Sequence, residues 1–293
     1  MTEFIMLVGL AGSGKSTFAK NTYSDYKILS SDELRLELFG TYEAFDHNGI
    51  LFDELTHRAK THLLIGNNVC FDATNLNSKK RMGILKSLPK DVRKIAVVVV
   101  ADPLTCIARD KKRYRKVGDN VILKMVTQFQ MPSKAEGFDD VQIHYSHNNV
   151  DGEALLLKHE EMVLEFDQKS KYHSLALGLH INKAVEHCRQ NSIYKDDENV
   201  ISALRAHDLG KPFSQSFDED GFAHYYGHEN VGAYLSLLYF QSNPQNVQEI
   251  ALLINNHMLL HDKNYSHQKI IDKFGQEFYE KLKIINDCDL AAH

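Results

Sequence analysis

One stretch of the chain has the residue types and spacing of a phosphate-binding loop. Residues 9–17 read Gly-Leu-Ala-Gly-Ser-Gly-Lys-Ser-Thr, which matches the pattern G-x-x-x-x-G-K-[ST]. Glycines let backbone N–H groups close around phosphate oxygens, and a helix that begins at the lysine adds a favourable potential. Lys15 would bridge the β- and γ-phosphates of ATP, and Ser16 would hold Mg²⁺. The expected nucleotide contacts are Gly9, Gly12, Ser13, Gly14, Lys15, Ser16 and Thr17.

Two carboxylates follow short strand-like runs and could complete a phosphoryl-transfer site. Asp32 would lie at the carboxyl edge of a sheet, where a kinase needs a carboxylate to accept the proton of the attacking hydroxyl. Arg35 lies on the same helical face and could pair with an acceptor phosphate. Asp72 is similar to a Walker B carboxylate. The structural alternatives are a helix N-cap for Asp32 and an Asx turn for Asp72.

Residues 109–116 read Arg-Asp-Lys-Lys-Arg-Tyr-Arg-Lys, with six basic residues against one acidic residue. We expect this run on a helix, and such a run is usually a solvated face. It nevertheless comes where a phosphoryl-transfer lid would lie, and an arginine there could stabilise transition-state charge.

Histidines are concentrated in the second half, because eleven of the 16 come after residue 150. The pair His207-Asp208 ends a predicted helix at 200–206, and Gly210 and Pro212 favour that ending. Imidazole and carboxylate together suit borderline divalent metals. The further candidate ligands are His180, His228, His257, Asp287 and Asp289.

Spacing leaves some of these choices open. His173, His180 and His187 are seven residues apart and share one helical face, so spacing does not identify the ligand. His224 precedes His228 by four residues and could support the site or contact phosphate. Four histidines are interpreted as ordinary core or surface residues: His159, His187, His261 and His267.

The pattern around the first group of residues alternates between strands and helices. Short apolar runs at 4–8, 27–29, 69–71 and 94–100 predict strands, with helices from about Lys15, Asp32 and Pro103. This alternation indicates an α/β P-loop domain with a parallel sheet and flanking helices. After residue 150 the apolar residues recur at helical spacing and no strand is predicted, so we expect an all-α domain there.

Length and charge support two domains. The 293 residues suit about two domains at ~150 residues each. We place a kinase-like domain at 1–150, a connector helix at 151–165 and a metal-dependent domain at 166–293, with the boundary between Ser146 and Asp151. The net charge of −5 comes entirely from the residues after 165.

Other features narrow the class of protein. No apolar run approaches the ~20 residues that a membrane span needs, and no secretory signal is visible at the start. The four cysteines are far apart, which argues against disulfides and favours a reducing cytoplasm.

Residues 3–145 resemble the 5′-hydroxyl polynucleotide kinase branch of P-loop phosphotransferases. The resemblance implies that Asp32 is the general base and that Arg35 contacts the acceptor's phosphate. It matches Asp72, Thr74 and Asn75 to an Asp-x-Thr-Asn element. It also matches Arg109 and Arg113 to the lid, with Arg113 on the ATP phosphates. The stretch 117–122 departs from the family's usual Val-Pro.

Residues 166–293 resemble the HD-domain metal phosphohydrolases, through Leu-Gly-Lys-Pro after His207-Asp208 and through residues 224–230. The resemblance implies one or two divalent transition metals of the Mn, Ni, Co, Fe or Zn class. One metal would be held by His180, His207, Asp208 and Asp289, with Asp289 preferred over Asp287. A second would be held by His228 and His257, and Lys211 would neutralise substrate phosphate. Two metals ~3.5–4 Å apart can activate water and clamp an in-line displacement at phosphorus.

Fusions of this type resemble bacterial and phage proteins that heal nucleic-acid ends. The resemblance implies ATP-dependent phosphorylation of 5′-OH ends and hydrolysis of 2′,3′-cyclic phosphates, and it leaves open the removal of the remaining 2′- or 3′-phosphate. It favours RNA or tRNA over DNA, with a functional link to an RNA ligase in the cytoplasm of a bacterium or phage-infected host. One alternative is a small-molecule or nucleoside kinase fused to an HD nucleotidase. Another is a non-catalytic ATP-sensing or toxin-like regulatory protein.

Overall fold

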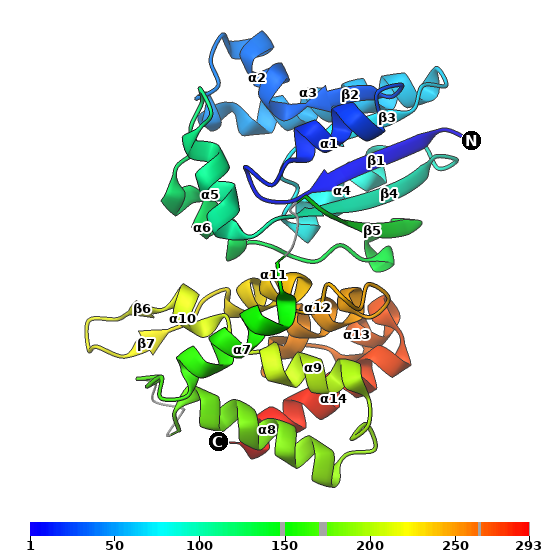
Figure 1. The fold of residues 1–293 in the computed structure, drawn as a ribbon. Helices are drawn as coiled ribbons and strands as arrows, with labels where there is room; N and C mark the ends of the chain where they lie inside the picture. Colours follow the sequence, from blue (N-terminus) through cyan, green and yellow to red (C-terminus); the bar gives the residue numbers. More distant parts are fainter. Residues whose placement is uncertain (147–149, 170–174, 263–264, 293) are drawn as a thin grey trace. The chain divides into compact units, whose positions relative to one another are not determined.

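The computed structural model describes residues 1–146, 150–169, 175–262 and 265–292. Contacts divide these residues into two compact units (Figure 1). The first unit contains residues 1–125 and the chain from Pro132 to the end of strand β5. The second contains Val126–Met131 and the chain from Val150 onward.

Five parallel strands form the sheet of the first unit, in the order β2-β3-β1-β4-β5. They are β1 (Glu3–Val8), β2 (Lys27–Ser30), β3 (Val69–Asp72), β4 (Arg93–Val100) and β5 (Asp140–Tyr145). Most of β4 is buried, as expected of a strand that helices cover on both faces. The predicted α/β class with a parallel sheet is therefore confirmed.

Alternation along the strands assigns one face of the sheet to each group of helices. Ile5 and Leu7 of β1 pack in one cluster with Ala19, whereas Phe71 of β3 lies beside Phe52 on the other face. Figure 1 shows the helices flanking the sheet. Those that precede β5 are α1 (Lys15–Thr22), α2 (Ser31–Phe39), α3 (Asn48–Leu64), α4 (Ser78–Ser87), α5 (Pro103–Lys111) and α6 (Asp119–Val126). The short 3₁₀ turns are η1 (Phe45–His47) and η2 (Lys134–Glu136).

The second unit is mainly helical. Its helices are α7 (Gly152–Val163), α8 (Leu177–Asn191), α9 (Glu198–Ala206), α10 (Lys211–Ser214), α11 (His228–Tyr239), α12 (Val247–Asn256), α13 (His267–Phe274) and α14 (Gln276–Ala291), with the 3₁₀ turn η3 (His257–Leu260). Helix α9 ends at Ala206, as predicted, so His207 and Asp208 begin the turn.

The expectation of no strand after residue 150 is wrong. Two strands, β6 (Ser216–Phe217) and β7 (Ala223–His224), form an antiparallel hairpin. Its turn is closed by the side chain of Asp218, which accepts hydrogen bonds from the backbone N–H groups of Asp220 and Phe222. Strands of two residues are too short to show a period in the sequence, so the pattern could not reveal them.

The division into units differs from the boundaries expected from the sequence. Residues 126–131 belong to the second unit because Asn255 Oδ1 accepts from Met131 N at 2.6 Å and Asn230 Nδ2 donates to Thr127 O at 2.8 Å. Helix α7, expected as a connector, also belongs there, and its Glu160 pairs with Arg205 at 2.9 Å. Residues 147–149 of the expected boundary lie outside the described residues.

No helix within the described ranges is both long enough and apolar enough to cross a membrane.

Candidate active sites

The loop between β1 and α1 has the backbone geometry of a phosphate cradle. Gly9 and Gly12 have φ values of 154° and 83°. A Cβ at Gly9 would lie 2.5 Å from the carbonyl oxygen of Val99, and one at Gly12 would lie 2.4 Å from that of Cys106. Both positions therefore require glycine, because a side chain would collide with neighbouring backbone.

Lys15 begins α1 and is buried within this loop. Its Nζ donates to the carbonyl oxygens of Gly9 at 3.0 Å and Leu10 at 2.7 Å. Burial lowers the pKa of Lys15, and the nearby Asp72 carboxylate opposes that shift. The ammonium is thus held among the loop carbonyls, where it can reach a bound phosphate.

Ser16 and Asp72 are brought together because β1 and β3 are neighbours in the sheet. Ser16 Oγ donates to Asp72 Oδ2 at 2.6 Å, and Asp72 is buried. A hydroxyl paired with a carboxylate at the end of a strand is the arrangement that holds Mg²⁺ beside nucleotide phosphates.

The loop after Asp72 is locked by a residue that the sequence analysis missed. Arg81 is fully buried and forms a bidentate ion pair with Glu136, at 2.7 and 2.6 Å. Its Nη1 also donates to the carbonyl oxygens of Asn75 and Leu76. The distance along the chain between Arg81 and Glu136 explains why no local motif identified the pair.

A hollow of about 510 Å³ opens beside the phosphate loop. Arg109 bridges its walls by donating to Ser146 O at 2.7 Å and to Ser146 Oγ at 3.0 Å. The rings of Phe18 and His144 stack with centroids 4.1 Å apart. The predicted nucleotide contacts Gly12, Gly14, Thr17, Arg109 and Arg113 line this hollow.

The basic run is helical only at its start, which corrects the prediction. Helix α5 ends at Lys111, so Arg109 is helical and Arg113 lies in the turn that follows. Asp110 Oδ2 accepts from the backbone N–H groups of Val117 and Gly118, at 2.8 and 3.0 Å. These bonds fold the run back toward the end of α5, so a continuous helix through it is excluded.

Asp32 lies in the first turn of α2, directly after β2. Ser30, and not Asp32, is the N-cap, since its side chain accepts from Glu33 N. Asp32 Oδ1 instead pairs with Arg35 Nη1 at 3.0 Å and with Arg115 Nη1 at 2.6 Å. Arg115 is one of six basic residues in the same run, so the sequence alone does not distinguish it from its neighbours.

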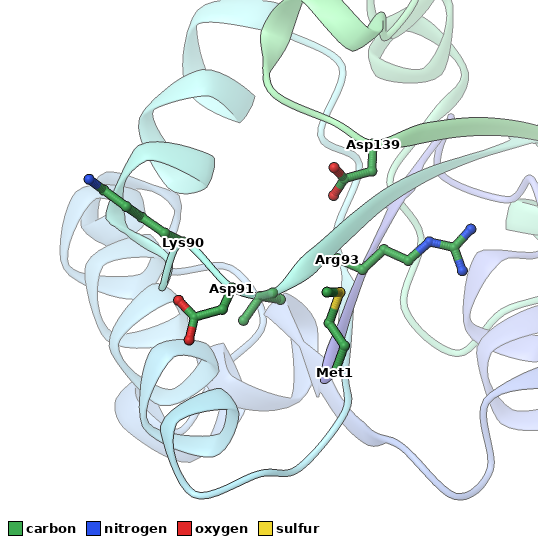
Figure 2. A pocket seen from close by; sticks show the side chains of 6 residues that line it. Met1, Lys90, Asp91, Arg93 and Asp139 are labelled. Atoms are coloured by element: carbon green, nitrogen blue, oxygen red, sulfur yellow. The ribbon is translucent and has the colours of Figure 1, made fainter.

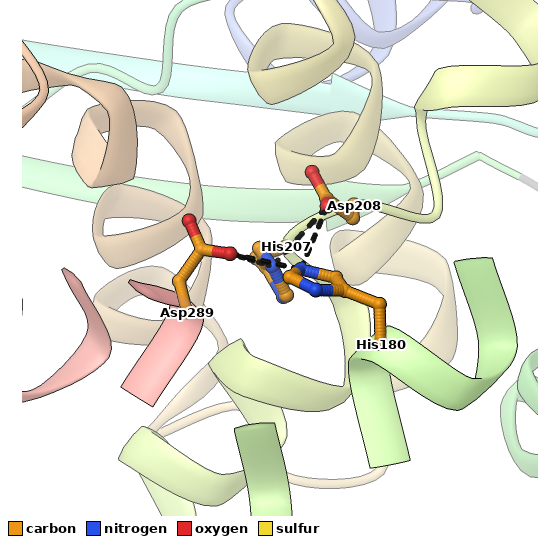
Figure 3. Close-up of side chains that lie close together, drawn as sticks. All are labelled: His180, His207, Asp208 and Asp289. Atoms are coloured by element: carbon orange, nitrogen blue, oxygen red, sulfur yellow. Dashed lines mark ion pairs between the residues drawn. The ribbon is translucent and has the colours of Figure 1, made fainter. Parts of the chain in front are cut away.

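In the second unit, four side chains predicted as ligands converge. Figure 3 shows His180, His207, Asp208 and Asp289 pointing toward one another. All four are buried, and each offers a ligand atom within 4.8 Å of the others. His180 Nε2 lies 2.8 Å from Asp289 Oδ1, although the two residues are far apart in the chain.

A second set adjoins the first through Asp208. Asp208, His228 and His257 also place ligand atoms within 4.8 Å of one another. His228 Nε2 lies 3.3 Å from Asp208 Oδ1 and 3.2 Å from His257 Nε2. The carboxylate of Asp208 therefore faces both sets of candidate ligands.

The histidine rings are oriented for metal binding. The Nδ1 atoms of His207, His228 and His257 each lie 2.7–2.8 Å from the backbone carbonyl three residues earlier, which fixes the proton on Nδ1. Each Nε2 is then the ring atom left to bind a metal, the usual arrangement of a metal-ligating histidine. Within the described part of the chain, the buried Nε2 of His207 makes no hydrogen bond. The donor set fits a divalent transition metal.

Charge coupling within the cluster is strong. Burial would lower the pKa of His207, but the carboxylates of Asp208 and Asp289 raise it to about 10. Burial would raise the pKa of Asp208, but Lys211 and the surrounding imidazoles hold it well below its usual range. A bound cation would replace the protons that now balance these carboxylates.

Lys211 stands beside the cluster, as predicted for a phosphate-neutralising group. Its Nζ lies 2.7 Å from Asp208 Oδ2 and donates to Gln168 Oε1 at 2.9 Å. It also lies over the ring of Tyr225, whose hydroxyl donates to the carbonyl oxygen of Gln168. Gln168 and Tyr225 were missed, since neither stands in a recognisable metal-ligand pattern.

The remaining candidates are placed as follows. Asp287 is exposed, and His224 pairs with Asp218 at 3.1 Å. His261, expected to be ordinary, lies with its Nε2 3.1 Å from Asp289 Oδ2. His173 lies outside the described residues.

Another hollow, of about 270 Å³, lies where β1, β4 and β5 begin (Figure 2). Met1, Arg93 and Asp139 line it, and it contains none of the predicted site residues. Because the phosphate loop follows the opposite end of β1, this hollow is separate from the kinase-like site.

Comparisons with known proteins identify both parts of the chain. A family model described as an AAA domain matches residues 4–132, and one described as an HD domain matches residues 171–291. Together they show a P-loop domain of the AAA type followed by an HD domain.

Individual relatives match in part. "Transcription factor bHLH140" of Arabidopsis thaliana is 26% identical over 158 residues, and the match covers 50% of this chain but only 16% of that protein. A chain from "Structure of the Pnkp1/Rnl/Hen1 RNA repair complex" is 23% identical, with 43% of each chain covered and a TM-score of 0.39. A gluconokinase from Sinorhizobium meliloti 1021 is 14% identical, with 50% of this chain and 84% of that chain covered and a TM-score of 0.38.

Proposed function

We propose that this chain, which joins an AAA-type P-loop domain to an HD domain, heals both ends of a broken nucleic acid. The first site would phosphorylate a 5′-hydroxyl with ATP, and the second would hydrolyse a 2′,3′-cyclic phosphate. RNA is the favoured substrate, and a ligase would use the healed ends. The observation that carries the proposal is that one chain has two sets of residues suited to phosphate chemistry, one with a carboxylate beside the phosphate loop and one with a histidine–aspartate cluster.

In the kinase reaction, Asp32 accepts the proton of the 5′-hydroxyl as its oxygen attacks the γ-phosphorus of ATP. The bond between the β–γ bridging oxygen and the γ-phosphorus breaks, and ADP leaves. Lys15 and the loop N–H groups would hold the phosphates, and Ser16 and Asp72 would hold the Mg²⁺ that accompanies ATP. Arg113 would neutralise the charge that develops on the transferred group.

In the hydrolase reaction, His180, His207, Asp208 and Asp289 would hold one metal, and His228 and His257 a second with Asp208. When bound, the metal would supply a Lewis acid that lowers the pKa of water and withdraws charge from the phosphate. Lys211 would bind a phosphate oxygen, and Gln168 with Tyr225 would keep its ammonium in place.

One substrate tests both reactions. An RNA with a 5′-OH and a 2′,3′-cyclic phosphate is incubated with the full-length protein, with and without ATP, and both ends are followed. We expect Asp32→Ala to abolish 5′-phosphorylation and leave the 3′ reaction intact, and His207→Ala to do the reverse. Failure of the wild-type protein to phosphorylate the 5′-OH end while phosphorylating a small alcohol or nucleoside would refute the proposal.

A further inference from the structure

Two guanidinium groups converge on one oxygen of Asp32. Arg35 Nη1 lies 3.0 Å and Arg115 Nη1 lies 2.6 Å from Asp32 Oδ1. Two positive charges thus face one negative charge, which leaves the cluster with a net positive charge. The side chain of Asp32 is 52% exposed, so the cluster is open to an incoming molecule.

Arg35 is rigidly held. It is 5% exposed, and its Nη2 donates to Asn48 Oδ1 at 2.9 Å. Its guanidinium lies 5.2 Å from the ring centroid of Phe45. Its Nε is buried and makes no hydrogen bond within the described residues.

Arg115 lies in the turn that follows α5, far along the chain from Asp32 and Arg35. Its guanidinium lies 5.2 Å from the centroid of Tyr42 and 5.8 Å from that of Phe45. Stacking on aromatic faces orients a guanidinium and leaves its N–H edge free to form bidentate bonds to an anion. The half-exposed ring of Phe45 therefore adjoins both arginines.

We propose that Arg115 helps to select the acceptor. Together with Arg35 it would bind the phosphate on the 3′ side of the reacting nucleotide. This inference rests on the proposed function and adds a second residue, Arg115, to the contact with the acceptor's phosphate that the resemblance implies for Arg35. The rings of Tyr42 and Phe45 would pack against the sugar and base of the acceptor nucleotide. A free nucleoside lacks the phosphate and leaves Arg115 on Asp32.

The pairing of Arg115 with Asp32 links binding of the acceptor's phosphate to proton transfer. The oxygen that must accept a proton is occupied by a guanidinium. A phosphate offers Arg115 a bidentate partner of the same charge sign as the carboxylate, so it can draw the guanidinium away. Only an acceptor with the phosphate would then expose Asp32 for proton transfer.

The test compares adenosine with adenosine 3′-phosphate, which differ only in the phosphate, and with the dinucleoside phosphate ApA, which adds a second nucleoside; all three have a free 5′-hydroxyl. With the full-length protein, we expect Arg115→Ala to raise the KM for ApA by about 10- to 100-fold, the effect of losing one charge-assisted pair. The KM for ATP should be unchanged, and adenosine should react no more slowly than with the wild type. Arg115→Lys should restore only part of the wild-type affinity for ApA, because lysine cannot form the bidentate contact.

The control is Lys112→Ala, an exposed lysine of the same basic run. It should behave as wild type, and retained ATP binding shows that each variant is folded. An unchanged KM for ApA in Arg115→Ala would overturn the inference and leave the proposed function standing. If the wild type transfers phosphate to none of these acceptors, calorimetric binding of ApA decides. Equal affinity of wild type and Arg115→Ala for ApA would then refute the role of Arg115.

Discussion

The Nε2 atoms of His228 and His257 lie 3.2 Å apart, and each ring has its Nδ1 against a backbone carbonyl. Burial, together with the neighbouring His228 and His207, lowers the pKa of His257 to about 3, so this ring is neutral at physiological pH. Both Nε2 atoms face one buried space and can coordinate a cation that lies between them. The pair thus has the character of a metal site.

Removing one of these rings should remove a metal ion. We expect His257→Ala to lower the metal bound at saturation by one ion per chain, measured by elemental analysis after dialysis against Mn²⁺ or Ni²⁺. His187→Ala, on helix α8, is the matched control and should retain the wild-type content. An unchanged content in His257→Ala would show that His228 and His257 hold no ion.

Metal loading should release protons. The pKa of His207 is raised to about 10 in the metal-free cluster, so this ring carries a second proton at pH 7, below that pKa. A metal needs the lone pair of Nε2, so binding must expel that proton. Calorimetry at pH 7 in buffers of different ionisation enthalpy should show about one proton released per chain. A binding enthalpy independent of the buffer would contradict this prediction.

The kinase site should depend on Asp72 without affecting the hydrolase. Asp72→Asn keeps the shape of the side chain but removes the charge that faces Ser16 Oγ at 2.6 Å. We expect kcat for phosphoryl transfer to fall by about 100-fold or more, as when a preorganised electrostatic contact is lost. Hydrolysis of the 2′,3′-cyclic phosphate should continue at the wild-type rate. Loss of both activities would instead indicate a general folding defect.

Arg81 and Glu136 should stabilise the first unit as a pair. Arg81→Met leaves Glu136 buried without its partner, which typically costs about 3–5 kcal/mol of unfolding free energy. Scanning calorimetry should show a lowered transition for the unit that ATP stabilises. The double variant Arg81→Met/Glu136→Leu should recover part of the loss, since it removes the unpaired charge. A double variant less stable than Arg81→Met would argue against this explanation.

Phe129 should stabilise the second unit, although it lies between α6 and η2 in the sequence. It is fully buried and packs edge to face against Tyr234, with centroids 5.1 Å apart. We expect Phe129→Ala to cost about 3–5 kcal/mol in the transition that metal stabilises. Leu123→Ala, on the exposed part of α6, should have little effect. A shift confined to the ATP-stabilised transition would assign residues 126–131 to the first unit instead.

Local sequence was informative where chemistry depends on neighbouring residues. The phosphate loop is contiguous in the sequence. Positions 9 and 12 must be glycine because any side chain there would collide with neighbouring backbone. Four of the five strands of the first unit were predicted, and the runs at 4–8, 69–71 and 94–100 are continuous and apolar because these strands are buried. Strand β5 was not predicted, since most of its residues are polar or only partly buried. The order of the histidine and aspartate elements likewise indicated the HD domain, which the family match confirms.

Helical phase explains why some choices could be made and others could not. Asp287 and Asp289 differ by about 200° around α14, so only one can face the cluster, and that one is Asp289. His180 and His187 differ by almost two full turns and share a face of α8. Their position along the helix, which depends on the packing of α8 against α14, decides that His180 reaches Asp289.

The sequence by itself determined the two domain classes, the phosphate loop and the set of candidate ligands, because each is encoded in short patterns of residue type. Only the tertiary structure decided which side chains meet. The pairing of Arg115 with Asp32, the clamp of Arg81 on Glu136 and the place of residues 126–131 in the second unit all join segments that are distant in the chain. Such contacts follow from packing and charge in three dimensions, which no local pattern records.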